Sequence, residues 1–195
     1  MTKKLFLSCL VVFLFLPAVV FAGPLQQGNG YVGIQYGYLM YDMDAISGDS
    51  NPSAIIGRVG YFVFDQVALE GRFGFGFSDD SARLPDDAGG TIRGDLELDR
   101  LYGAYLAGYL PLGGFGSAYG VLGYTDAKAT FSADGFSSSI SDGGFSFGFG
   151  GNVYIEYRES AYKEHRWAIN VEYMRYLNES GYKLDAYGFG VAFQF

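Results

Sequence analysis

The sequence predicts an all-β fold, an eight-stranded antiparallel up-and-down transmembrane β-barrel. From Tyr31 onward, segments of about ten residues alternate apolar with small or polar side chains. Aromatic residues make up 18% of the 195 residues and charged residues only 17%, and glycine occurs 30 times. The chain also ends inside a strand pattern, on the aromatic Phe195. These three observations suit one domain whose strands meet lipid rather than water.

The first element is a leader. Lys3 and Lys4 precede a long apolar run that ends at Ala22, an order typical of a cleaved secretory signal peptide. An uncleaved helical anchor is the alternative, because the run is nearly long enough to span a bilayer. We expect a signal peptide at residues 1–22 and an outer-membrane β-barrel domain at residues 23–195.

Export changes the composition of the chain. The single cysteine, Cys9, lies in the leader, so the mature fold must depend on backbone pairing and packing rather than on a disulfide. Removing Lys3 and Lys4 makes the formal charge of −8 more negative, and nucleic acid is therefore not an expected partner.

Eight strands are predicted, with ends placed to within about three residues. Their ranges are 31–41, 53–63, 67–77, 98–110, 116–128, 144–157, 166–176 and 183–195. The connections alternate between long (42–52, 78–97, 129–143) and short (64–66, 111–115, 158–165), and the last, 177–182, is moderate. Outer-membrane barrels have short periplasmic turns and longer outside loops, so both termini are expected in the periplasm.

The strand at 67–77 indicates which face meets lipid. One face carries Leu69, Phe73 and Phe75, and the other carries small or charged residues such as Glu70 and Arg72. Small and charged side chains suit a narrow closed interior, which leaves the aromatic face outward. Outward aromatic rows are stable only in lipid, where every backbone group must be paired and the sheet must close.

The last strand closes the barrel against the first. Its lipid-facing row is Tyr187, Phe189, Val191, Phe193 and Phe195, while the alternate positions are small or polar. Further outward rings are expected near strand ends, where they would form interface belts. These rings are Tyr36, Tyr38, Tyr157, Trp167 and Tyr173.

Several short stretches carry a family resemblance. They are Tyr31-Val32-Gly33, Gly60-Tyr61-Phe62, Val67-Ala68-Leu69-Glu70, Tyr119-Gly120-Val121-Leu122-Gly123-Tyr124, Gly148-Phe149-Gly150-Gly151 and the terminal Phe195. In this order the chain resembles the eight-stranded outer-membrane β-barrel family of Gram-negative bacteria, the OmpA/OmpX-type transmembrane domain, often labelled porin-family. The resemblance covers nearly the whole mature chain. It implies that the aromatic-terminated last strand is the signal read by the barrel assembly machinery.

Alternation also places charged residues on the inward faces. A candidate lumen charge network consists of Arg58, Glu70, Arg72, Glu156 and Glu172, while the orientation of Arg100 stays open because its strand alternates ambiguously. The interior of an eight-stranded barrel is just wide enough for side chains, so these charges are expected to pair and plug it. A narrow, intermittently hydrated pore is the alternative.

No catalytic, cofactor-binding or metal site is predicted, and the protein is expected not to be an enzyme. Some barrels of this architecture are lipid-modifying enzymes that pair a histidine with Ser or Asp near the outer rim. The only histidine, His165, is expected in the short turn at 158–165, at the opposite end, as a solvated residue. Neither metal-ligand spacing, a phosphate loop nor a nucleophile motif is present.

The predicted outer loops are acidic. They contain Asp42, Asp44, Asp49, Asp79, Asp80, Asp86, Asp87, Asp95, Glu97, Asp134 and Asp142. Such loops suit divalent cations or a basic ligand, but solubility and mutual repulsion are the favoured explanation. The Ser- and Gly-rich segment from Phe131 to Asp142 is expected to be a flexible loop. Arg175, expected on the lipid face near the outer end of its strand, is a candidate contact for lipopolysaccharide.

We therefore expect a monomeric outer-membrane barrel with a structural or surface-interaction role. Its expected partners are outer-membrane lipids and lipopolysaccharide, the barrel assembly machinery, and a surface ligand that the sequence does not identify. A narrow diffusion pore is the alternative function, and a lipid-modifying enzyme is a third.

Overall fold

The computed structural model describes residues 25–43, 52–78, 80–85, 91–133, 136–159, 164–179 and 182–195. The predicted signal peptide lies outside the described residues. Within them, one sheet contains all the strands, and a short 3-10 helix interrupts the chain once. The elements are β1 (Gly30–Met43), β2 (Ser53–Phe64), β3 (Val67–Ser78), β4 (Asp80–Pro85), β5 (Thr91–Pro111), η1 (Gly113–Phe115), β6 (Gly116–Ala133), β7 (Phe136–Glu159), β8 (Glu164–Glu179) and β9 (Tyr182–Gln194).

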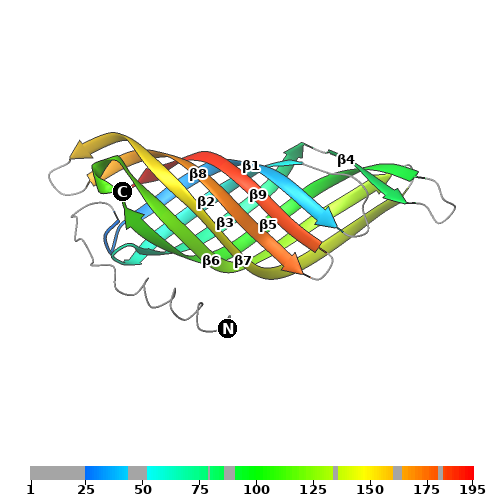
Figure 1. Cartoon of the computed structure of the whole chain (residues 1–195), viewed down its shortest axis with the longest axis horizontal. Coiled ribbons are helices and arrows are strands. Elements are labelled where there is room, and N and C mark those ends of the chain that lie inside the picture. Colours follow the sequence, from blue (N-terminus) through cyan, green and yellow to red (C-terminus); the bar gives the residue numbers. More distant parts are fainter. Residues whose placement is uncertain are drawn as a thin grey trace, which may run out of the picture.

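Eight of these strands form a closed antiparallel barrel (Figure 1). Neighbours in the barrel follow the chain order, except that β3 pairs directly with β5. β9 returns to β1, with Tyr31 opposite Gln194, and Phe195 and Gly30 exchange two backbone hydrogen bonds of 2.8 and 2.9 Å. The predicted barrel is thus confirmed, and the last residue is held in the sheet.

The barrel has two different ends. The turn end holds Gly30, Phe195, the two-residue turn between β2 and β3, and η1 between β5 and β6. At the other end, which we call the hairpin end, β4, β5, β6 and β7 continue beyond the remaining strands (Figure 1). This extension, formed by β4, residues 91–97 of β5, residues 130–133 of β6 and residues 136–143 of β7, is the protruding sheet.

The protruding sheet corrects two predicted loops. Residues 78–97 were expected to be a loop, but they contain β4, which pairs with the first part of β5 from Asp80 opposite Leu96 to Pro85 opposite Thr91. Residues 129–133 and 136–143, within the second predicted loop at 129–143, are strand as well, because β6 and β7 pair up to Ala133 opposite Phe136. In β7, the consecutive residues Ser137, Ser138 and Ser139 are all exposed, so this part of the sequence lacks the alternation used to find strands.

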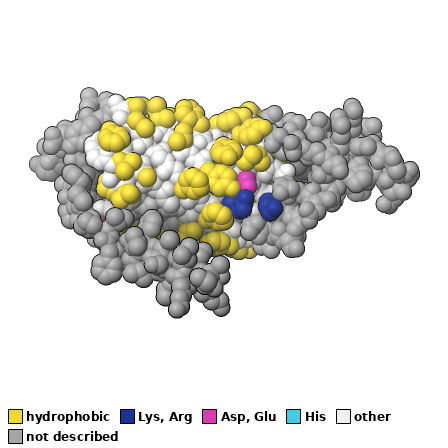
Figure 2. Space-filling view, viewed as in Figure 1, with side chains coloured by type: hydrophobic (Ala, Val, Ile, Leu, Met, Phe, Trp, Pro, Cys, Tyr) yellow, Lys and Arg dark blue, Asp and Glu magenta, His cyan; other side chains and the backbone are white. Residues whose placement is uncertain are grey.

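The outer face of the barrel is apolar, as expected for strands in lipid. Phe73 and Phe75 are each 52% exposed, whereas Arg72, which precedes Phe73 on the opposite face of the strand, is 3% exposed. Tyr36, Tyr38, Trp167 and Tyr187 are also exposed, Tyr173 is half-buried, and the side chain of Tyr157 lies outside those described. Figure 2 shows hydrophobic side chains spread over this surface and a few charged ones gathered beside them. No helix in the described part of the chain is long and apolar enough to cross a membrane.

Glycines inside the barrel make room for rings. A Cβ atom on Gly60 would lie 2.1 Å from Cζ of Tyr31, and one on Gly150 would lie 2.6 Å from Cζ of Tyr119. These aromatic side chains therefore lie flat against the wall of the barrel. The frequent small residues on the inward faces are required by the size of the lumen.

A β-bulge explains the ambiguous alternation around Arg100. The pairing of β5 with β6 shifts by one residue between Leu98 and Arg100. Leu98 is buried, and Arg100 is exposed on the outer face, with its guanidinium 6.0 Å from the ring centre of Tyr102. A bulge reverses the facing of the residues that follow it, so simple alternation fails there.

Candidate functional site

Four charged residues meet in the middle of the lumen. Arg58 comes from β2, Glu70 and Arg72 from β3, and Glu172 from β8. Arg58 and Arg72 are direct cross-strand partners, and Glu70 lies on the same face of β3 two residues earlier. Glu172 reaches the group from the opposite side of the barrel. We call these four residues the central charge network.

Arg72 connects both carboxylates. Its Nε lies 2.6 Å from Oε1 of Glu70, and its Nη1 and Nη2 lie 2.6 and 2.8 Å from the two oxygens of Glu172. Arg58 binds Glu70 through Nη2 at 2.7 Å and lies 3.8 Å from Glu172. Two arginines and two glutamates form a neutral group, and the fork of Arg72 matches the carboxylate geometry of Glu172.

Tyrosines complete the hydrogen bonding of the network. Tyr31 donates to Glu70, and Tyr119 donates to Glu172 at 3.0 Å. Tyr119 also accepts from Nη1 of Arg58 at 3.2 Å. The guanidinium of Arg72 lies 4.9 Å from the ring centre of Tyr105. The charges are therefore held by rings as well as by each other.

Burial makes the network costly to disturb. The side chains of Arg58, Glu70, Arg72 and Glu172 are at most 3% exposed. A buried charge that loses its partner costs about 3–5 kcal/mol, although an intact pair need not stabilise a fold more than packed apolar residues would. The charged residues come from β2, β3 and β8, and the tyrosines come from β1, β5 and β6. The network therefore connects six strands of the barrel.

Aromatic rings fill the lumen between the network and the turn end. Phe62 and Tyr109 pack at 5.3 Å between ring centres, and Tyr109 and Tyr119 are also 5.3 Å apart. Tyr31 lies 5.7 Å from Phe62. Beyond them Leu25 is buried, and its carbonyl accepts a backbone hydrogen bond of 2.7 Å from Gln66. The residues before β1 thus contribute to closing this end.

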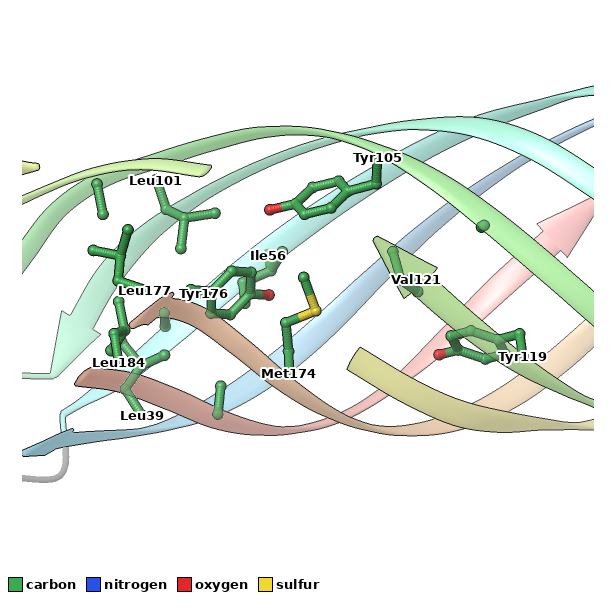
Figure 3. Close-up of a cluster of buried hydrophobic side chains, with 14 of the residues drawn as sticks. Leu39, Ile56, Leu101, Tyr105, Tyr119, Val121, Met174, Tyr176, Leu177 and Leu184 are labelled. Carbon is green, nitrogen blue, oxygen red and sulfur yellow. The ribbon is translucent and has the colours of Figure 1, made fainter. Parts of the chain in front are cut away.

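Aliphatic side chains fill the lumen on the other side of the network. On β2, the next inward residue from Arg58 toward the hairpin end is Ile56. On β8, the next inward residue from Glu172 in the same direction is Met174. Figure 3 shows part of this group inside the barrel wall. Its members are at most 1% exposed, and we call them the aliphatic layer: Leu39, Ile56, Leu98, Leu101, Met174, Leu177 and Leu184.

The structure brings together four of the five residues of the predicted lumen network. The side chain of the fifth, Glu156, lies outside the described residues, and a bulge between Tyr154 and Glu156 interrupts the alternation used to place it. The sequence interpretation missed Tyr31 and Tyr119. Tyr31 could have been found, because the outward placement of Tyr36 and Tyr38 puts odd-numbered residues of this strand inside.

Arg175 lies on the outer face but already has a partner. Its Nε and Nη2 donate to the two oxygens of Asp185 at 2.7 and 2.8 Å. The two residues are directly opposite in β8 and β9, and Arg175 also lies 5.8 Å from the ring centre of Phe147. Asp185 was missed, although pairing the last two predicted strands in register would have suggested it.

The C-terminal aromatic row is on the outer face of β9. Tyr187 and Phe189 are each 57% exposed, and Val191 and Phe195 are each 38% exposed. Phe193 is half-buried, because its ring lies 5.0 Å from that of Trp167 and 6.0 Å from that of Phe195.

His165 is not a solvated turn residue. It lies in β8, opposite Arg158, and its ring stacks on that of Phe193 at 5.8 Å. Residues 158–165 were expected to form a turn, but β7 continues to Glu159 and β8 begins at Glu164. In the part of the chain that the structure describes, no group of three or more His, Cys, Asp or Glu residues could hold a metal ion.

Most of the acidic residues predicted for the outer loops lie outside the described side chains. Glu97 and Asp142 are the two whose side chains are described, Glu97 exposed and Asp142 partly exposed. Nearby, Asp99 pairs with Lys128 at 3.1 Å and accepts a hydrogen bond of 2.8 Å from Thr130. The described part of this surface therefore contains one ion pair, Asp99 with Lys128, beside the acidic Glu97 and Asp142.

Comparison with known proteins identifies the fold independently. A family model described as outer membrane protein beta-barrel domain matches residues 8–195. Ail, the attachment invasion locus protein of Yersinia pestis, has a TM-score of 0.58 at 20% identity, over 87% of this chain and 100% of that chain. OprG of Pseudomonas aeruginosa has a TM-score of 0.53 at 16% identity, over 88% of this chain and 98% of that chain. Neisserial surface protein A has a TM-score of 0.53 at 11% identity, over 86% of this chain and 98% of that chain. No curated protein matches the chain.

Proposed function

Because the chain belongs to the outer-membrane β-barrel family, we propose that it is a monomeric integral outer-membrane protein with a structural and surface-interaction role. The interior of the barrel is a structural plug, and the protruding sheet is the part that meets a partner. The turn end, with both ends of the mature chain, faces the periplasm, and the hairpin end faces outward.

The observation that carries the structural role is the filled lumen. The central charge network has its charges paired inside the barrel, and the aliphatic layer covers it on one side. An ion crossing this interior would have to displace paired guanidinium groups and then pass closely packed apolar side chains, where it would lose its hydration. This arrangement favours a plug over the alternative of a diffusion pore.

The protruding sheet supports the surface role. Pairing of β7 with β8 begins at Phe147 opposite Arg175, and the hydroxyl of Ser146 still donates to the carbonyl of Tyr176 in β8 at 2.7 Å. From Phe136 to Gly143, no described strand of the sheet pairs with the β8 side of β7. A strand edge with unpaired backbone groups is a template for an extended segment of another protein. Ail, of similar fold, is named an attachment invasion locus protein. We infer that attachment through this edge is the surface activity.

Two other partners belong to the same proposal. Lipopolysaccharide would contact the barrel at Arg175 and Asp185, on the part of the outer face nearer the hairpin end. The barrel assembly machinery would read the C-terminal row that ends at Phe195. Catalysis has no support among the described residues, because His165 packs against Phe193 rather than beside a nucleophile.

Planar-bilayer recording of the refolded mature chain tests the plug. We expect no steady channels, in protein whose folding is shown by a heat-dependent shift on gels. The Glu70→Ala variant is recorded beside it, and reproducible channels in the wild type that this substitution alters would establish the pore instead. For the surface role, cells that carry a barrel without the protruding β6–β7 hairpin should lose adhesion, while keeping the protein in the outer membrane.

A further inference from the structure

Two buried amide side chains face the lumen next to the central charge network. Gln35 of β1 and Asn170 of β8 are both register partners of Gly190 in β9. They are 2% and 1% exposed. Because Gly190 has no side chain, nothing from β9 separates the two amide groups at this position.

Three polar atoms of this pair have no hydrogen-bond partner within the described residues. They are Nε2 and Oε1 of Gln35 and Oδ1 of Asn170. Asn170 uses its Nδ2 to donate to the hydroxyl of Tyr119 at 3.2 Å, which leaves only its oxygen without a partner. A buried unsatisfied polar group is unfavourable, and natural proteins commonly satisfy such groups with ordered water.

The glycines of β9 show where the Gln35 side chain lies. A Cβ atom on Gly190 would be 2.8 Å from Cγ of Gln35, and one on Gly188 would be 3.3 Å from its Nε2. The same point at Gly188 is 3.7 Å from Cβ of Glu172. The Gln35 side chain therefore crosses β9 toward β8, where Asn170 and Glu172 are located.

We propose that Gln35 and Asn170 bind ordered water inside the barrel, beside the central charge network. A water in this position accepts from Nε2 of Gln35 and donates to Oδ1 of Asn170, and Oε1 of Gln35 accepts from the same or a second water. Both side chains supply the two to four polar contacts that a buried water requires. The water then hydrates the glutamate side of the network from within the membrane.

A polar wall connects this site to the turn end. Asn170 is directly opposite Asn152, which donates to Ser117 at 3.1 Å. Tyr154 donates to the same Ser117 at 3.0 Å, and the guanidinium of Arg166 lies 3.5 Å from the ring centre of Tyr154. The aliphatic layer lies on the other side of the network. The proposed water site therefore lies in the polar part of the lumen, and the aliphatic layer bounds it toward the hairpin end.

The test is nuclear magnetic resonance of the refolded mature chain in lipid nanodiscs, with the side-chain amides of Gln35 and Asn170 assigned. We expect both NH2 groups to show cross-peaks at the water frequency with NOE and ROE of opposite sign, the mark of long-lived bound water. The Asn170→Leu variant should lose the water cross-peaks of Gln35. Gln26→Leu, at an exposed position before β1, should keep them and serves as the matched control.

The wild-type spectrum decides the question even if Asn170→Leu does not fold. Absence of water cross-peaks at Gln35, with its amide protons instead close to the carboxylate of Glu172, would overturn the proposal by showing a direct protein contact. Water cross-peaks that persist unchanged in folded Asn170→Leu would also overturn it, because the water would then not be shared by the two amides.

Discussion

The barrel and the protruding sheet are parts of one continuous sheet, yet their side chains follow different rules. In the barrel, each strand presents one face to lipid and one to a filled lumen, as the buried Arg72 followed by the exposed Phe73 illustrates. In the protruding sheet, consecutive residues Ser137, Ser138 and Ser139 are all exposed. The difference teaches that hydrophobic alternation reports the lipid environment of a strand, whereas strand pairing itself can continue without it.

The largest expected effect is at the central charge network. Arg72→Ala leaves Glu172 and Glu70 buried with fewer partners, and we expect the free energy of unfolding to fall by about 3–5 kcal/mol. Urea unfolding of the refolded protein in lipid vesicles, followed by the fluorescence of the single tryptophan Trp167, measures it. Arg100→Ala, at an exposed arginine of β5, is the control and should cost less than about 0.5 kcal/mol. Equal losses would mean that the network does not hold the barrel together.

The aliphatic layer should be the next most sensitive region. Leu101→Ala removes a side chain that is 0% exposed, and we expect a loss of about 3 kcal/mol from lost packing and the resulting cavity. Leu106→Ala changes the same residue type in the same strand, where the side chain is 50% exposed to lipid, and should cost less because lipid can fill the space. If Leu106→Ala proved the more destabilising, the lumen would not be packed as described.

Arg175 tests where the barrel leaves the lipid. Its ion pair with Asp185 is partly exposed, with side chains 27% and 19% accessible, so Arg175→Ala should destabilise by about 1 kcal/mol or less. An arginine near the bilayer midplane would instead be unfavourable by about 2–4 kcal/mol, and its removal would stabilise the protein. The sign of the change in the free energy of unfolding, measured by urea titration, therefore distinguishes a position at the membrane boundary from one near the bilayer midplane. Asp185→Ala should change this free energy in the same direction.

The smallest effect is expected in the protruding sheet. Replacing the residues between Thr130 and Ser139 with an Asn-Gly turn should change the free energy of unfolding by less than about 0.5 kcal/mol, because the side chains described there, those of Ser132, Ser137 and Ser138, are exposed. The same turn placed between Tyr124 and Phe145 is the matched comparison, since it removes pairing at the edge of the apolar band. We expect the deeper replacement to lower the yield of folded barrel on heat-shift gels. A large loss from the shallower one would show that the protruding sheet supports the barrel.

How far the sequence predicts this molecule depends on the region. Alternation places Glu70, Arg72 and Glu172 on the faces where the structure has them, because a strand in lipid has a fixed period of two. It fails at Arg100 and is interrupted beside Glu156, since a bulge adds one residue without any distinctive local sequence. It also misses β4, and it misses the ends of β6 and β7, where Ser132, Ser137, Ser138 and Ser139 are exposed.

By itself the sequence determined the all-β class, the number of membrane-spanning strands and the direction in which their faces point. These follow from local periodicity and from the rule that backbone groups in lipid must be paired. Only the tertiary structure decided that Arg72 joins Glu70 to Glu172 across the lumen, that Arg175 pairs with Asp185, and that Gln35 and Asn170 flank Gly190. These contacts depend on register and closure, which bring together residues far apart in the chain, and no local pattern encodes that distance.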